Sequence, residues 1–314
     1  VFTTRLGMST ADNDRFLRMW PEVSTDRVGF SMGSREEARR SGRRWFPYQK
    51  GGGYRKWYGN HLFLVDWEND GERIRGFERS HNHNLDYIFR RGITWSDVST
   101  RDIPFRYMPE GFLFDGRGSS GFVEGDSNIE EIIGFLNSGV TEYLLRVLNP
   151  TIGVNVNEVE KLPFKIDEIR RRSEELAQLT RQCIEKARLD WDAREYSWDF
   201  IQHPLVQHNT ALLTEAYASW KQQATDDFLQ LHANEEELNE LFIDLYGLED
   251  EISPRVALDD IMILEDEVDR DALEELDDER GDLSDEELRQ RFLEDDPDDA
   301  LFPVEVPIRQ FLSY

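Results

Sequence analysis

The sequence predicts an α+β fold: a mixed αβ domain over residues 1–165, a helical spacer over residues 166–248 and an acidic segment over residues 249–314. Residues 1–165 contain short apolar runs separated by polar, glycine-containing loops, which is typical of strands joined by functional loops. From Ile129 onward, apolar residues recur at helical spacing. Charge divides the chain as well. Residues 1–165 hold 23 Lys and Arg against 23 Asp and Glu, so the net charge of −28 lies entirely after Lys165.

The first part of the chain alternates between turns and short strand-like runs. Residues 10–14 are expected to form a turn or a helix cap before a helix over residues 15–20. Strands are expected at residues 61–67, 93–98 and 112–114, and a loop at residues 115–120.

Helical spacing then continues through residues 129–148 to Asn149 and Pro150, which break it. Residues 151–164 are expected to be extended. Asp167 is expected to cap a long helix with apolar positions from Ile169 to Ala187, and a second apolar stripe runs from Leu212 to Leu245, with Gly247 as its stop. Two long amphipathic helices with few breaks predict an antiparallel pair or a small bundle, which is expected to serve in packing or spacing.

The acidic segment is dominated by carboxylates. Residues 249–299 hold 24 Asp and Glu against 5 Lys and Arg. Such a composition is typical of a solvated or disordered surface, so we expect this block to contribute little to the core. Mimicry of nucleic acid is the less favoured interpretation. Residues 301–314 regain apolar character, so the chain is expected to continue into folded structure.

The run from Tyr48 to Asn60 stands out as a possible binding surface. It combines three consecutive glycines with three cations and four aromatic residues. Glycine lets a backbone approach another body closely, arginine and lysine can meet phosphates or base edges, and aromatic rings offer flat faces for stacking. Arg43 and Arg44, followed by two aromatic residues, repeat the pattern. The alternative is an aromatic-rich hairpin whose rings are core and whose arginine is a buried ion-pair partner.

Several function classes are not supported by any motif. The chain has no phosphate-binding loop of the nucleotide hydrolases, no zinc-ligand spacing and no recognisable catalytic constellation, so no catalytic, cofactor-binding or metal-binding residue is predicted. The single cysteine, Cys183, excludes an internal disulfide and fits a reducing cytoplasm. No signal peptide and no apolar run long enough for a bilayer are present, so no membrane association is expected.

Four stretches, in this order, resemble PglX-type adenine-specific DNA methyltransferases, the modification enzymes of BREX phage-defence systems. They are Lys50–Asn60 (Lys-Gly-Gly-Gly-Tyr-Arg-Lys-Trp-Tyr-Gly-Asn), the region from Leu148-Asn-Pro-Thr-Ile to Lys161-Leu-Pro-Phe164, Trp191–Phe200 and Asn234–Leu248. The likeness covers about residues 1–260. The first stretch resembles the family's target-recognition region.

The resemblance implies transfer of a methyl group from S-adenosylmethionine to the adenine amino group, using an Asn-Pro-Pro-Tyr motif and a glycine-rich cofactor loop. Neither motif is present, because the one Asn-Pro, Asn149-Pro150, continues with Thr151. The chain therefore resembles the specificity part of such an enzyme, with S-adenosylmethionine expected in the parent enzyme and no cofactor in this chain.

The implied partners are double-stranded DNA, the catalytic domain of the same parent chain and possible further defence proteins. The competing hypothesis is a protein-interaction module that does not contact DNA directly. The expected DNA-binding residues are Arg43, Arg44, Lys50, Gly52, Tyr54, Arg55, Lys56, Trp57, Tyr58 and Asn60, with Arg106 and Arg117 on a second loop region.

Overall fold

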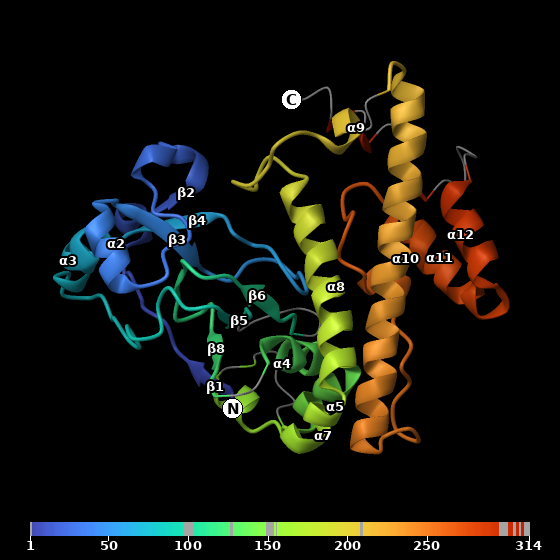
Figure 1. The fold of residues 1–314 in the computed structure, drawn as a ribbon, viewed down its shortest axis with the longest axis horizontal. Coiled ribbons are helices and arrows are strands. Elements are labelled where there is room, and N and C mark those ends of the chain that lie inside the picture. The colour runs from blue at the N-terminus through green and yellow to red at the C-terminus, as the bar shows by residue number, and fades with distance from the viewer. Residues whose placement is uncertain are drawn as a thin grey trace.

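The computed structural model describes residues 2–96, 103–125, 128–148, 154, 156–207, 210–294, 301–303, 306–307 and 309–310. Strands lie at one side of the molecule and long helices at the other (Figure 1), which confirms the α+β class. The Asn149-Pro150 break and part of the second family-like stretch lie outside the described residues.

Two four-stranded sheets make up the strand side. The first has the order β1-β8-β5-β6 and is antiparallel throughout; the second has the order β2-β4-β3-β7, in which only β3 and β7 are parallel. The strand bounds are β1 Phe2–Arg5, β2 Leu17–Met19, β3 Trp45–Gln49, β4 Phe63–Asp66, β5 Gly92–Thr94, β6 Arg106–Met108, β7 Leu113–Phe114 and β8 Ser120–Val123. The strands expected near residues 61–67, 93–98 and 112–114 are therefore present, each shorter than its apolar run.

The strand side also contains short helices. They are α1 Asn13–Phe16, α2 Arg35–Ser41 and α3 Glu68–Arg75. The helix expected over residues 15–20 is wrong beyond Phe16. Asp12 caps α1 as an acceptor for the Arg15 backbone N–H, but Leu17 already begins β2, whose register with β4 satisfies its backbone groups.

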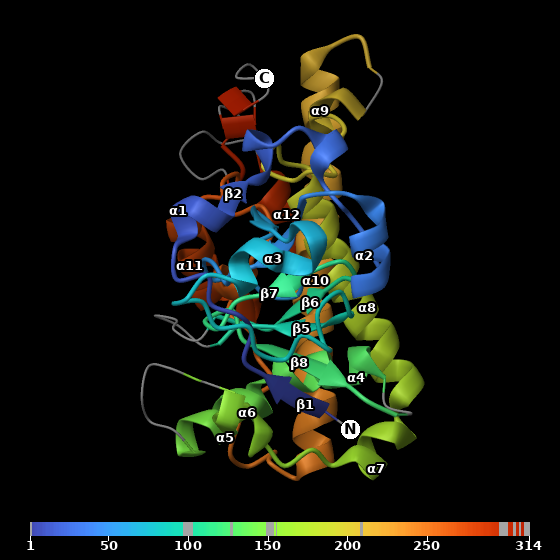
Figure 2. The same cartoon turned by 90° about the vertical axis from the view of Figure 1, so that its left-hand side faces the viewer.

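The helical side is built on two antiparallel helices, α8 Ser173–Asp192 and α10 Leu213–Tyr246, which stand upright side by side in Figures 1 and 2. Arg172, just before the start of α8, pairs with Asp244 near the end of α10, and Lys186 farther along α8 pairs with Asp227 in the middle of α10. The two helices therefore run in opposite directions. Gly247, with φ +69°, ends α10 as expected. The predicted antiparallel pair is thus confirmed. The cap expected at Asp167 is wrong, because Asp167 lies inside the short helix Ile166–Arg171 and the long helix α8 begins only at Ser173.

Smaller helices pack around this pair. They are α4 Ile129–Leu136, α5 Gly139–Leu148, α6 Val156–Glu160, α7 Ile166–Arg171, α9 Pro204–Gln207, α11 Arg270–Glu279 and α12 Asp285–Leu293. Helix α6 replaces part of the extended chain expected over residues 151–164. None of the helices in the described part of the chain has the length and apolarity to cross a bilayer.

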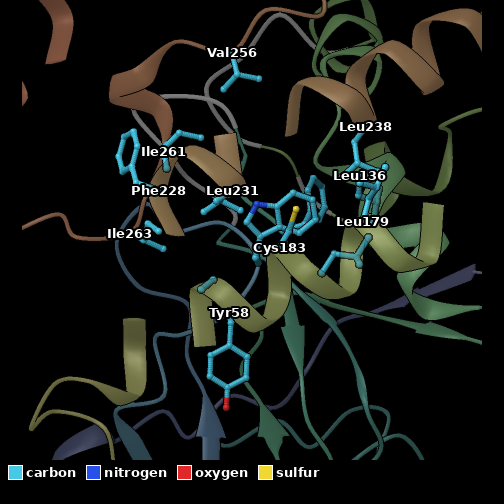
Figure 3. Close-up of a cluster of buried hydrophobic side chains, with 14 of the residues drawn as sticks. Tyr58, Leu136, Leu179, Cys183, Phe228, Leu231, Leu238, Val256, Ile261 and Ile263 are labelled. Carbon is cyan, nitrogen blue, oxygen red and sulfur yellow. The ribbon is translucent and has the colours of Figure 1, made fainter. Parts of the chain in front are cut away.

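The acidic segment does not behave as its composition suggests. Helices α11 and α12 fold within it, and Leu273, Leu276, Leu288 and Phe292 are buried. Figure 3 shows Val256, Ile261 and Ile263 in the same cluster as Phe228 and Leu231 of α10. The expectation that residues 249–299 contribute little to the core is wrong. The few apolar residues lie three or four apart, so they share one helical face while the carboxylates occupy the other.

Candidate nucleic-acid interface

A glycine loop follows β3 and packs closely on its surroundings. Gly51 and Gly52 have φ values of +83° and +147°, which side chains rarely adopt, and a Cβ on Gly52 would lie 2.7 Å from the Asn60 side chain. Asn60 Nδ2 donates to the Gly53 carbonyl at 3.0 Å, and Ser96 Oγ donates to the Gly52 carbonyl at 3.1 Å. Gly51 and Gly52 therefore need glycine for their conformation, and Gly52 needs it for space as well.

A second loop lies against the first. A Cβ on Gly118 would be 2.8 Å from the Gly51 backbone nitrogen. Asp115 joins the two loops, since its carboxylate accepts from Lys50 Nζ at 3.3 Å and from the Arg117 backbone N–H at 2.8 Å. Gly52, Gly53 and Arg117 are exposed and Lys50 is partly exposed. We call these four residues the glycine-loop surface.

Arg43 and Arg44 lie at the other end of β3, roughly 17 Å away along a five-residue strand. Arg43 is half-buried. The Arg44 guanidinium forms an ion pair with Asp66 at 2.9 Å and covers the Trp45 ring, with 28% of its side chain exposed. The structure therefore separates the two basic-aromatic runs that look alike in the sequence.

The second half of the glycine-containing run turns inward, toward α8. Arg55 is 5% exposed, forms an ion pair with Asp190 and lies over the ring of Trp191. Its Nε also donates to the Tyr58 carbonyl at 3.0 Å. Burial tends to raise the pKa of Asp190, but Arg194 and Arg55 outweigh it and hold that pKa below its ordinary value. Asp190 therefore forms ion pairs with two arginines, Arg55 and Arg194.

Lys56 and Trp57 meet a single carboxylate on α10. Lys56 Nζ lies 2.9 Å from Glu235 Oε2, and Trp57 Nε1 donates to Glu235 Oε1 at 2.6 Å. Burial alone would lower the pKa of Lys56, but the Glu235 charge outweighs it and raises the pKa. Tyr58 is also buried, and burial raises its pKa. Tyr54 is half-buried. These contacts fasten the run to both long helices.

Arg106 is fully buried behind the glycine loop. Its guanidinium donates from Nη1 to the Arg55 carbonyl at 3.2 Å and from Nη2 to Ser96 Oγ at 3.3 Å. Burial, with the nearby Arg55 charge, lowers its pKa to about 10. Of the twelve expected DNA-binding residues, the structure brings Lys50, Gly52 and Arg117 together at the surface, and Asn60 supports them from below.

Asp190, Glu235 and Asp115 organise this region, and none was expected from the sequence. Glu235 gave a signal that could have been used. It lies four residues after Leu231 and three before Leu238, so it occupies the apolar face of α10. A carboxylate on such a face is buried only with a partner, which here is Lys56.

Comparison with known proteins identifies long relatives. Over 275 residues the chain is 38% identical to the adenine-specific methyltransferase PglX of Lacticaseibacillus casei (strain Zhang), covering 84% of this chain and 22% of that protein. Over 249 residues it is 32% identical to the adenine-specific methyltransferase BrxX of Escherichia coli O9:H4 (strain HS), covering 78% of this chain and 19% of that protein. The chain thus spans about a fifth of these relatives. No protein-family profile matches it.

Proposed function

Because the chain belongs to the PglX/BrxX family of adenine-specific methyltransferases, we propose that it is the DNA-recognition part of such an enzyme and that it serves phage defence. The observation that supports this proposal is that the chain matches only part of each relative and also lacks the methyltransferase motif. Similarity extends over most of this chain but a fifth of the relatives, and the sequence carries no Asn-Pro-Pro-Tyr.

S-adenosylmethionine is proposed to bind elsewhere in the parent enzyme. A cofactor loop of glycines is expected between a strand and the start of a helix, where the helix supplies N–H groups. The Gly51–Gly53 loop follows β3, but it leads into a bridge between Trp57 and Arg106 and then into β4, without a helix. The residues present therefore do not fit this cofactor.

The glycine-loop surface is the proposed point of DNA contact. Lys50 and Arg117 supply two cations beside Gly52 and Gly53, which have no side chains to hold a phosphate away from their backbone. Flipping of the target adenine would belong to the catalytic part, while flanking bases are contacted from outside it. Arg43 and Arg44 remain a second proposed contact at the far end of β3.

Charge reversal at this surface tests the proposal. A variant with Lys50→Glu and Arg117→Glu should bind a randomised pool of DNA duplexes at least tenfold more weakly, with unchanged circular dichroism. Arg170→Glu with Arg171→Glu is the matched control, because it reverses the same number of charges and both arginines are exposed on α7, before the start of a 20-residue helix whose far end holds Asp190. That helix is roughly 30 Å long. Equal affinities of the double variant and the control would reject DNA contact here.

A protein-interaction role is the second candidate, and one observation favours it. Six of the ten exposed large apolar residues in the described part of the chain lie between residues 189 and 213: Leu189, Tyr196, Ile201, Val206, Leu212 and Leu213. Ile201 is 90% exposed. We propose the remaining parent chain as the occupant, since the relatives are four to five times longer than the matched region. Ile201→Asp should then weaken assembly with the catalytic part and leave DNA binding unchanged.

A further inference from the structure

Arg106 is a buried cation without a carboxylate partner among the described residues. Among the described residues, the ion pairs behind the glycine loop involve Arg55, Arg194, Asp190 and Glu267, and none of them includes Arg106. Asp190 pairs with Arg55 and Arg194, and Arg194 also pairs with Glu267. Arg106 adds a further positive charge, and Arg55 is close enough to lower its pKa. The Arg106 charge is therefore not neutralised by an ion pair with any described residue.

The hydrogen bonds of Arg106 are incomplete as well. Its two terminal nitrogens reach neutral acceptors, the Arg55 carbonyl and Ser96 Oγ, while Nε is buried with no acceptor. His61 lies close enough for Arg106 to affect its pKa, which burial and the two arginines lower to about 3, so His61 is neutral and adds no compensating charge. Buried charges are ordinarily paired and buried donors ordinarily bonded.

A chain of two hydrogen bonds links Arg106 to the exposed part of the glycine loop. Ser96 Oγ accepts from Arg106 and donates to the Gly52 carbonyl, and Gly52 and Gly53 are exposed. The link consists of the Ser96 side chain and glycine backbone. Glycine adopts positive and negative φ with similar ease, so residues 51–53 can change conformation at low cost.

We propose that Arg106 is the cation of a covered phosphate-binding site and that the Gly51–Gly53 loop moves aside to admit a DNA phosphodiester. A guanidinium offers parallel N–H donors that match two phosphate oxygens, and the unbonded Nε completes such a fork. The anion supplies the ionic partner that Arg106 lacks among the described residues. The identity of the anion as DNA rests on the proposed function; the site itself requires only phosphate-like chemistry.

A reversible crosslink tests the movement of the loop. A Cβ on Gly51 would lie 3.7 Å from Ser96 Cβ, within the range of roughly 3.5–4.5 Å found in disulfides. The pair Gly51→Cys with Ser96→Cys can be oxidised with oxidised glutathione and reduced again. Cys183 is fully buried and does not interfere. Any strain from the positive φ of residue 51 is common to both redox states, so each protein is its own control.

The readout is duplex DNA affinity across salt concentrations. The reduced form should bind at least tenfold more tightly than the oxidised form, and oxidation should reduce the slope of log affinity against log salt by about 0.9 for each phosphate that the oxidised form no longer binds. Ser96→Cys alone should not respond to oxidant. Arg106→Met is the second variant. It should reduce the slope of log affinity against log salt by the same amount as oxidation does. Equal binding of the two redox forms would overturn the proposal, even if Arg106→Met fails to fold.

A second probe separates this site from the proposed function. Sulfate, at constant ionic strength, should raise the melting temperature of the reduced form but not of the oxidised form. If no form binds DNA but this sulfate effect persists, the recognition function fails and the anion site stands. If sulfate acts equally on both redox forms, the covered site is rejected.

Discussion

The two halves of the run from Gly51 to Tyr58 face in opposite directions. Gly52 and Gly53 are exposed and held by single hydrogen bonds from Asn60 and Ser96. Arg55, Lys56 and Trp57, only two residues later, are bonded to Asp190 and Glu235 on the two long helices. Adjacent residues of similar composition thus divide between a potential binding surface and an internal anchor.

This contrast shows that basic and aromatic residues can identify a candidate binding stretch in the sequence. They do not determine whether its side chains face the solvent or the interior. Direction here depends on backbone turns. Trp57, Gly59 and Asn60 have positive φ values, so the chain reverses sharply around Tyr58. It also depends on carboxylates that lie 135 and 178 residues away in sequence, at Asp190 and Glu235. Neither factor is visible in the pattern of basic and aromatic residues within the run itself.

The anchor should give the largest effect on stability. Glu235→Ala leaves the Lys56 ammonium buried without its partner and removes the acceptor of Trp57 Nε1. We expect the free energy of unfolding to fall by about 3–5 kcal/mol in urea denaturation. Asp227→Ala is the matched control on the same helix, since the Asp227 pair with Lys186 is about a quarter exposed, and should cost about 1 kcal/mol or less. Equal costs would show that the anchor is no stronger than a surface pair.

The acidic segment extends the contrast to a second region. Leu276→Ala in α11 should lower the free energy of unfolding by about 2–5 kcal/mol, because Leu276 is 2% exposed within the main core cluster. Glu274→Ala on the exposed face of the same helix should change it by about 0.5 kcal/mol or less. A negligible effect of Leu276→Ala would restore the view that this segment lies outside the core.

Features set by local spacing were predicted well from the sequence. The antiparallel helix pair, the stop at Gly247 and strands β4 and β7 follow from periodicity and glycine. Features set by long-range pairing were not. The block over residues 249–299 looked solvated because a charge count averages over helical faces, whereas Leu273 and Leu276 share one face. At the site, Gly52, Lys50 and Arg117 could be selected from the sequence, but the inward turn of Arg55 could not.

Acid should weaken the anchored side through His61. The His61 ring is buried among Tyr58, Phe112 and Trp198, and its pKa is lowered to about 3 from an ordinary 6.5. The unfolded chain therefore takes up this proton more readily, so stability falls as the pH drops below 6.5 and the loss is complete near pH 3. Between pH 6.5 and pH 5 we expect about 2 kcal/mol from this group.

Denaturant titrations at several pH values check this expectation, with His61→Phe as the comparison. His203 and His232 also have lowered pKa values, so the native chain should lose more stability than His61 alone accounts for. At low pH the His61→Phe variant should still lose the stability that depends on His203 and His232, but it should not lose the part that depends on His61. Parallel pH profiles for the two proteins would show that His61 is not a buried neutral group.

The smallest effect on stability is expected at the surface, where DNA binding should respond instead. Arg117→Ala should change the free energy of unfolding by about 0.5 kcal/mol or less, because Arg117 is exposed, yet flatten the salt dependence of duplex affinity by about 0.9 in slope. Arg43→Ala makes the same change of side chain at the opposite end of β3. If both variants flatten the slope, the bound duplex extends along the whole strand. If Arg117→Ala alone does so, contact is confined to the glycine-loop surface, and the arginines before β3 are structural. An unchanged slope in both would remove the two ends of β3 from the DNA interface and leave the interaction role as the better explanation of the exposed loops.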